Sequence, residues 1–257
     1  CGKENIASRY LMNRNQLEHS KYPWTAIVSL FSKKQSINIT AAVINSRYVI
    51  TVAAPFSIMK EKAIVYYNKF KRSDLVGGIE VEKIITHEKY RNNGKQKNND
   101  IALLKLKDEI KFNDEMKPIC LPNENMTEYE NFNFTIASMG DVGYGLYYML
   151  PENMQEIWMQ IVDITKCEES YRNYLKSGYP YKLNKQMHIC ASSTEKHICR
   201  GDAGAALMHR HQGKMYALGI ASFSKKICSE KPAVFTKVVN YLEWIKNNTK
   251  EGEYCGN

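Results

Sequence analysis

Short runs of β-branched and aromatic residues recur along this chain, and polar, turn-forming stretches separate them. The clearest runs are residues 26–31, 43–51, 63–67, 81–85 and 101–106. Runs of this length between polar loops are typical of strands in a barrel or a sandwich. The last apolar segment, residues 239–245, spaces its apolar residues as a helix does. The sequence therefore predicts an all-β fold that ends in a helix.

The 257 residues suffice for one large β domain or two small ones. Hydrophobic residues make up 44% of the chain and charged residues 25%, which argues against disorder. Because no run of about 18 apolar residues occurs, we expect no membrane span. The chain begins at Cys1 without a basic and apolar leader, so we expect that any signal peptide has already been removed.

Seven cysteines lie far apart, and no Cys-x-x-Cys pair suggests a zinc or redox site. This spacing favours disulfides in an oxidising compartment, and it predicts no metal and no cofactor. Four Asn-x-Thr sequons also favour a secreted, extracellular glycoprotein. They begin at Asn38, Asn125, Asn133 and Asn247.

The formal net charge of +9 has two interpretations. It could attract an anionic glycan, a lipid surface or nucleic acid. It could also reflect a Lys-rich composition that keeps a secreted protein soluble. No run of five basic residues occurs, so the second interpretation is favoured and no specific nucleic-acid partner is expected.

Residues 197–207 read His-Ile-Cys-Arg-Gly-Asp-Ala-Gly-Ala-Ala-Leu. This segment resembles the nucleophile segment of trypsin-like serine proteases. Other stretches of the chain resemble further markers of that family, and they occur in the same order as in the family. The other markers are residues 22–24, 47–51, 99–104, 118–122 and 232–238. The resemblance implies a chymotrypsin-like double six-stranded antiparallel β-barrel with a C-terminal helix. It implies a protease-like domain over residues 22–247, a linker over 1–21 and a tail over 248–257.

In this family Ser attacks, His takes its proton, and Asp orients the His. The resemblance places the base at Ala54, the acid at Asp100 and the nucleophile at Ala203. Losing the nucleophile or the base alone costs on the order of 10⁶ in turnover. The sequence therefore predicts an inactive serine protease homologue, or pseudoprotease, in which Asp100 is an inherited buried carboxylate.

Activation and substrate binding are also altered relative to the family. Arg9 occupies the cleavage position, but Tyr10 replaces the small apolar residue whose freed amine would insert beside Asp202. The specificity pocket carries His197, Ser224 and Ala233, where a basic-specific member has Asp and two glycines. We expect these side chains to narrow or close the slot.

Two deliberately introduced alanines are an alternative origin of Ala54 and Ala203. They would not explain Pro55, Ala205 and Ala206, so a natural pseudoprotease is favoured. Gly-Asp-Ala-Gly also occurs in haptoglobin, a member of this superfamily that binds haemoglobin without cleaving it. A third alternative is a residual hydrolase with a nucleophile foreign to the family.

The resemblance also implies disulfide pairs. These are Cys1–Cys120, Cys167–Cys190 and Cys199–Cys228. Cys255 is left over. It predicts an intermolecular disulfide, a disulfide to a cysteine outside the given sequence, or a cysteine in an inconsequential, disordered tail.

Loops carry binding functions on rigid scaffolds. The candidate exosite residues are Arg91, Lys95, Lys97, Lys225 and Lys226. We expect a protein partner, namely a protease of an extracellular cascade of the complement, clotting or phenoloxidase type, its substrate or its inhibitor. The resemblance is to arthropod protease homologues in particular. A haptoglobin-like ligand-binding module is the alternative.

Overall fold

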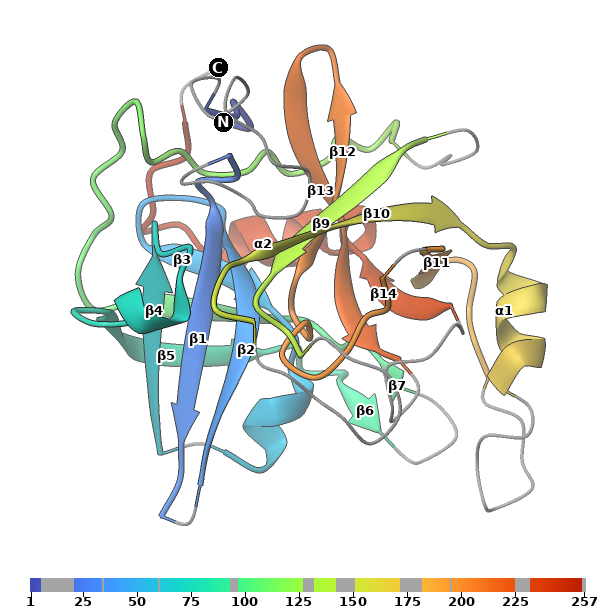
Figure 1. Cartoon of the computed structure of the whole chain (residues 1–257), viewed down its shortest axis with the longest axis horizontal. Helices are drawn as coiled ribbons and strands as arrows, with labels where there is room; N and C mark the ends of the chain where they lie inside the picture. Colours follow the sequence, from blue (N-terminus) through green and yellow to red (C-terminus); the bar gives the residue numbers. More distant parts are fainter. Residues whose placement is uncertain are drawn as a thin grey trace.

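The fold consists of two closed six-stranded antiparallel barrels (Figure 1). The computed structural model describes residues 1–5, 21–33, 35–59, 61–92, 97–126, 132–141, 151–171, 182–194, 196–224 and 232–255. The predicted double-barrel fold with a C-terminal helix is confirmed. None of the helices in these ranges is long and apolar enough to cross a membrane.

The first barrel closes in the order β1-β2-β3-β8-β5-β4. Its strands are β1 (Thr25–Phe31), β2 (Ser36–Val43), β3 (Tyr48–Thr51), β4 (Lys62–Tyr67), β5 (Ile79–Thr86) and β8 (Ala102–Leu106). Ile27, Ile50 and Leu103 are almost fully buried inside it. Apolar burial of this kind is the main favourable contribution to folding.

The second barrel closes in the order β10-β11-β14-β13-β12-β9. Its strands are β9 (Phe134–Ser138), β10 (Gln155–Ile161), β11 (His188–Ser192), β12 (Ala206–His211), β13 (Lys214–Phe223) and β14 (Ala233–Lys237). Phe134, Leu207 and Phe235 lie in a separate hydrophobic cluster of this barrel. Closure leaves neither barrel with an open sheet edge.

Shorter elements connect and cover the barrels. They are the two-stranded sheet β6 (Arg91–Asn92) and β7 (Lys97–Asn98), the helices α1 (Ile164–Tyr171) and α2 (Leu242–Asn248), and the 3-10 turns Ala54–Ser57, Arg72–Asp74 and Val238–Tyr241. The predicted helix over residues 239–245 is thus a 3-10 turn that continues into α2.

The predicted strand over residues 43–51 is wrong in its middle, where β2 ends and β3 begins. The side-chain oxygen of Asn45 accepts hydrogen bonds from the backbone N–H groups of Arg47 (3.0 Å) and Tyr48 (2.8 Å). Asn side chains that bind the backbone two residues later stabilise turns. Asn45 therefore turns the chain between two strands.

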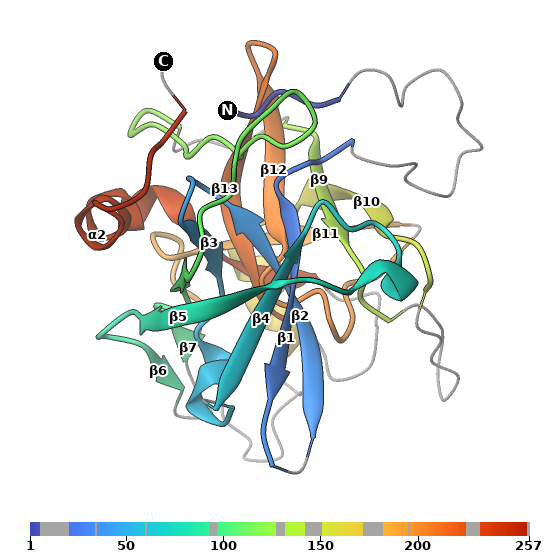
Figure 2. The ribbon, with the colours of Figure 1, turned by 90° about the vertical axis from the view of Figure 1, so that its left-hand side faces the viewer.

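The amino terminus is fixed to the second barrel. Cys1 forms a disulfide with Cys120. Gly2 donates to Pro118 O (2.8 Å) and accepts from Met215 N (2.8 Å), with a positive φ of 65° that favours glycine. Figures 1 and 2 both place this end beside the projecting β12–β13 hairpin.

Candidate functional site

Asp100 lies where the two barrels meet, and it is fully buried. Its Oδ1 accepts hydrogen bonds from the backbone N–H groups of Ala53 (2.9 Å) and Ala54 (2.8 Å), directly after β3. Its Oδ2 accepts the hydroxyl of Ser222 in β13 (2.5 Å). Thr236 in β14 donates to the Asp100 carbonyl (2.9 Å). The buried carboxylate therefore links the first barrel to the second.

Lys97 supplies the positive charge beside this carboxylate. Its Nζ lies 2.9 Å from Asp100 Oδ2 and also donates to Ser222 O (2.8 Å). Only 12% of the Lys97 side chain is exposed. The prediction of Lys97 as an exosite residue is therefore corrected, because its ammonium points inward and is paired. An Asp three residues later was the available sequence signal.

His188 is a further buried titratable group near Asp100. The backbone N–H of Asn184 donates to His188 Nδ1 (3.1 Å), so Nε2 carries the proton and faces Lys97 O (3.2 Å). Burial lowers the pKa of His188. Both ring nitrogens are therefore engaged with backbone groups, and the ring fixes the strand that carries Lys97.

Ala203 lies in a turn that is joined to the first barrel. Thr40 N donates to Ala203 O (2.9 Å), and Thr40 Oγ1 donates to Gly201 O (2.9 Å). Gly201 and Gly204 flank Ala203 with φ values of 91° and 89°. These values lie in the left-handed region, which explains why glycines occupy both positions.

Asp202 is buried directly beneath this turn. Its carboxylate accepts from the Ser138 hydroxyl and from Cys199 N (2.7 Å). Burial raises the pKa of Asp202 to about 7, although hydrogen bonds from Ser138, Cys199 and Gly140 act in the opposite direction. The contact with Ser138 was not predicted, because nothing in the local sequence connects the two residues.

A cavity of about 600 Å³ opens beside Ala203, between the two barrels. Most of the side chains that are described in its lining are apolar, and none of these is acidic. The described lining residues are Ile37, Asn38, Ile39, Pro55, Ile198, Cys199, Arg200, Gly201, Ala203, Ala221, Ser222, Phe223 and Ser224. The cavity is open, while the expected narrowing of the slot stays a prediction. Its described lining is suited to an apolar group rather than to a cation.

Of the three predicted pocket residues, one lines this cavity and two do not. Ser224 lines it and donates its hydroxyl to Ile198 O (3.0 Å). Ala233 is buried and packs in the core of the second barrel. His197 is half-buried and is not part of the lining. Arg200, which the sequence did not single out, is the basic residue among the described lining.

The cysteine pairs lie on the rigid parts of the fold. Besides Cys1–Cys120, Cys167 of α1 is joined to Cys190 of β11. Cys199 is disulfide-bonded, whereas its expected partner Cys228 lies outside the described residues.

Among the described positions, Cys255 is the free cysteine, and it is half-buried. An intermolecular disulfide at this residue stays a prediction. The expectation of a disordered tail is wrong, because Glu251 and Glu253 of the tail contact the first barrel.

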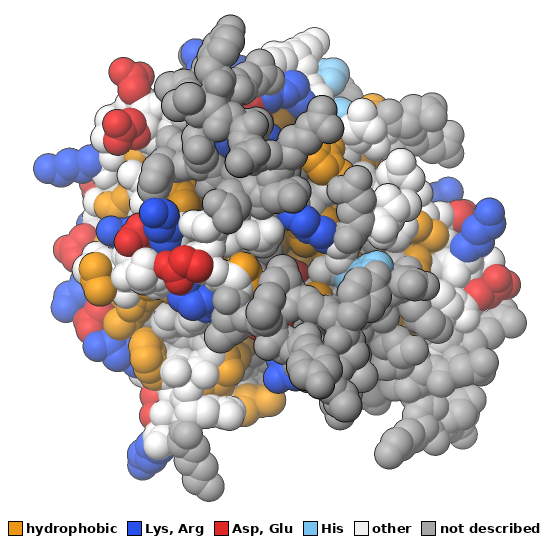
Figure 3. Space-filling model, in the orientation of Figure 1, with side chains coloured by type: hydrophobic (Ala, Val, Ile, Leu, Met, Phe, Trp, Pro, Cys, Tyr) orange, Lys and Arg blue, Asp and Glu red, His pale blue; other side chains and the backbone are white. Residues whose placement is uncertain are grey.

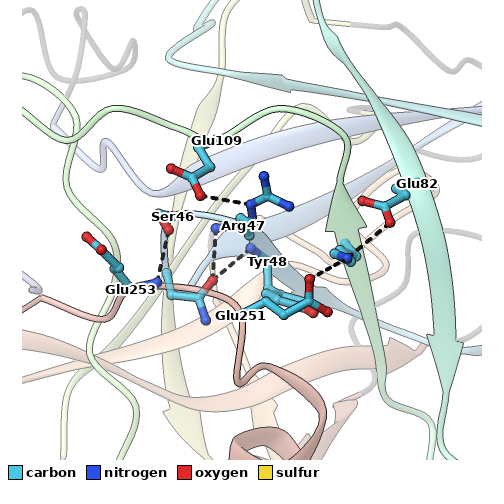
Figure 4. A network of polar contacts seen from close by, with 9 residues as sticks. Ser46, Arg47, Tyr48, Glu82, Glu109, Glu251 and Glu253 are labelled. Atoms are coloured by element: carbon cyan, nitrogen blue, oxygen red, sulfur yellow. Dashed lines mark hydrogen bonds and ion pairs between the residues drawn. The ribbon is translucent and has the colours of Figure 1, made fainter.

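The tail over residues 249–255 packs on the first barrel (Figure 4). Glu251 forms an ion pair with Lys105 of β8, at 2.7 Å. Glu253 and Ser46 form two hydrogen bonds. Ser46 N donates to the Glu253 carbonyl (3.1 Å), and Glu253 N donates to the side-chain oxygen Oγ of Ser46 (3.0 Å). Cys255 is therefore held at a defined place on the surface.

The predicted surface sites are only partly described. Arg91 is exposed, whereas Lys95, Lys225, Lys226 and the segment with Arg9 and Tyr10 lie outside the described residues. On the face shown in Figure 3, Lys and Arg side chains alternate with Asp and Glu over the first barrel.

The predicted glycosylation sites differ in their surroundings. Asn125, Asn133 and Asn247 are exposed. Asn38 is half-buried and lines the cavity. A glycan at Asn38 would therefore lie at the cavity mouth.

Comparisons with known proteins agree with this architecture. The sequence profile of the family described as Trypsin matches residues 12–245. The Spaetzle-processing enzyme of Drosophila melanogaster is 29% identical over 263 residues, which covers 88% of this chain but 63% of that protein. Phenoloxidase-activating factor 1 of Holotrichia diomphalia is 23% identical over 274 residues, which covers 97% of this chain and 72% of the relative. The solved structure of GrC matches with a TM-score of 0.76 at 23% identity, covering 93% of this chain and 100% of the other, and this likeness shows the fold.

Proposed function

The chain belongs to the trypsin family, and we propose that it is a secreted member without catalytic activity that acts by binding proteins. The observation that supports this most strongly is the pair of methyl groups at the two reacting positions. Ala54 caps Asp100 through its backbone N–H but carries no imidazole, and Ala203 carries no hydroxyl beside the cavity. Neither side chain can accept a proton or attack a carbonyl.

The surroundings of these alanines support a long-established loss of chemistry. The ammonium of Lys97 contacts Asp100. Ser224 and Ile198 line a cavity in which no described lining residue is acidic. These are several separate changes, and a single lost hydroxyl does not require any of them. We therefore regard the retained Asp100 and Asp202 as structural groups that hold the barrels and the turn.

The relatives indicate which proteins such a scaffold would meet. Their names describe processing of Spaetzle and activation of phenoloxidase. We infer that this chain binds a protease of an extracellular cascade, its substrate or its inhibitor. Disulfides at Cys1–Cys120 and Cys167–Cys190 suit an oxidising compartment outside the cell.

The alternative is a ligand-binding module, in the manner inferred above from haptoglobin. The cavity of about 600 Å³ favours it, because cavities of this size bury small apolar ligands or a partner's side chains. In this case the binding residues would lie in the cleft rather than on the surface loops.

Capture from plasma that contains an active cascade tests both functions. We expect the immobilised protein to retain clotting, complement or phenoloxidase factors and to leave a broad panel of peptide substrates uncleaved. Two charge reversals provide a matched pair: Arg91→Glu in the exposed strand β6 and Arg200→Glu at the cavity. Loss of capture with Arg91→Glu alone supports an exosite, and loss with Arg200→Glu alone supports the cleft alternative. Peptide turnover by the purified protein would overturn the proposal.

A further inference from the structure

Asp100 is surrounded by hydrogen-bond donors on both oxygens. An ionised carboxylate offers about four lone-pair sites. Two donors approach Oδ1, namely Ala53 N at 2.9 Å and Ala54 N at 2.8 Å. Two approach Oδ2, namely Ser222 Oγ at 2.5 Å and Lys97 Nζ at 2.9 Å. The acceptor capacity of this carboxylate is therefore filled.

Lys97 contributes the donor that carries a positive charge. In an active triad the donor with that charge is the imidazolium of the base, which is held by the same acid. Ala54 ends in a methyl group, which leaves room beside Asp100 for another side chain. The Lys97 ammonium binds Asp100 Oδ2 from the neighbouring strand β7.

Lys97 is fixed at both its backbone and its ammonium. Its carbonyl faces His188 Nε2 of β11 at 3.2 Å, and its Nζ donates to Ser222 O of β13 at 2.8 Å. The ammonium also lies 5.6 Å from the centre of the Phe223 ring. These contacts all reach from β7 to the second barrel, so the side chain spans the junction between the barrels.

We propose that Lys97 is a positioning residue that takes the place of the missing imidazolium: it holds the buried Asp100 and occupies the site at which a base would bind. This inference rests on the proposed loss of catalysis. It adds a reason why the folded protein stays stable without the catalytic base. A buried carboxylate left without its charged partner is destabilising. Lys97 removes that destabilisation within the same chain.

The proposal predicts that an imidazole introduced by Ala54→His cannot bind Asp100 while Lys97 is present. The variants to compare are Ala54→His, Ala54→His with Lys97→Met, and Ala54→His with Lys107→Met as the control. Methionine keeps the length of lysine without its charge. Lys107 is a suitable control because 65% of its side chain is exposed.

Proton NMR reports the contact directly, because an imidazole N–H bound to a buried carboxylate gives a strongly deshielded signal. We expect this signal only in the variant that lacks Lys97. The signal in Ala54→His with Lys97 intact would overturn the inference. Thermal unfolding of each variant shows that the fold is kept.

A measurement on the unaltered protein covers the case in which a variant does not fold. Acylation by an amine-specific reagent, followed by peptide mass spectrometry, should modify Lys97 at least about tenfold more slowly than Lys107, because the native contacts must open first. Equal rates would contradict the inference. Peptide cleavage by the native protein would instead contradict the proposed function and leave the Lys97–Asp100 contact unaffected.

Discussion

Thr40 of the first barrel donates its hydroxyl to the carbonyl of Gly201 in the second, with Oγ1 and O 2.9 Å apart. The adjacent backbone bond from Thr40 N to Ala203 O has the same length. The turn that would carry a nucleophile is therefore held by β2, independently of any catalytic contact. This explains how the turn would persist in a chain without catalytic activity, as we propose.

Gly204→Ala should destabilise the protein strongly. An added Cβ would overlap the Thr40 carbonyl and the Thr51 hydroxyl, and the φ of 89° is unfavourable for alanine. We expect a loss of about 3 kcal/mol or more in the free energy of unfolding, measured with urea.

Gly213→Ala separates backbone strain from overlap. Gly213 has a similar φ of 75°, but no atom lies within 4 Å of its added Cβ. Its substitution should cost only about 1–2 kcal/mol. Equal losses at the two positions would contradict the packing of Gly204 against the first barrel.

The stability of the protein should depend on the protonation of Asp202. Its folded pKa of about 7 lies above the ordinary value of 3.8, so the folded state binds the proton more tightly than the unfolded state. The stabilisation is fully present below pH 3.8 and is lost as the pH rises to about 7. Within that window the contribution falls by on the order of 1.4 kcal/mol for each pH unit.

Asp202→Asn should therefore flatten the fall in unfolding free energy between pH 4 and pH 8. Asp163→Asn is the control and should leave the profile between pH 4 and pH 8 as it is, because backbone N–H groups of Lys166 and Thr165 lower the pKa of Asp163 from its ordinary value of 3.8. The Asp163 contribution is lost as the pH falls. An unchanged pH profile in Asp202→Asn would show that this carboxyl does not titrate in the window.

The disulfide between Cys167 and Cys190 should contribute substantially to stability, because it closes a loop over a sequence separation of 23 residues. Replacing both cysteines with alanine should lower the free energy of unfolding by about 3 kcal/mol. Cys255→Ala is the matched control and should change it little, since that thiol is free. Similar losses would mean that Cys255 is itself engaged in a bond.

The docked tail gives a fourth prediction. An added Cβ at Gly252 would overlap the side chain of the buried Asn45. Gly252→Ala should release the tail and speed amide exchange at Glu253, whose N–H bonds Ser46. Lys250→Ala, at an exposed neighbour, should leave that exchange rate as it is. Unchanged exchange in Gly252→Ala would contradict the docking.

The fold could be predicted from sequence because its signals are local or occur in a fixed order. The runs at residues 63–67 and 101–106 appear as β4 and β8 with bounds that differ by one residue. The error at residues 44–47 arose because one side-chain bond from Asn45 outweighs the β propensity around it. Helix α1 was missed, since its sequence is polar. The side chain of Asp163 caps the helix by accepting hydrogen bonds from the backbone N–H groups of Thr165 and Lys166.

The site was less accessible to sequence reasoning, because its contacts join residues that are far apart in the chain. The Ser138–Asp202 and Ser222–Asp100 bonds span 64 and 122 residues. Lys97 was predicted as an exosite residue on a surface loop, since lysine side chains are mostly exposed. Only the closed barrels bring its ammonium to a fully buried carboxylate.

The most direct test of the central claim is intact-mass analysis of the unaltered protein after incubation with a serine-reactive phosphonate. An active family member treated in parallel shows that the reagent works. With alanine at positions 54 and 203, we predict no mass increase and no turnover of the peptide panel. Stoichiometric addition of one phosphonate per chain would contradict the account, because it would require a nucleophile activated within this fold.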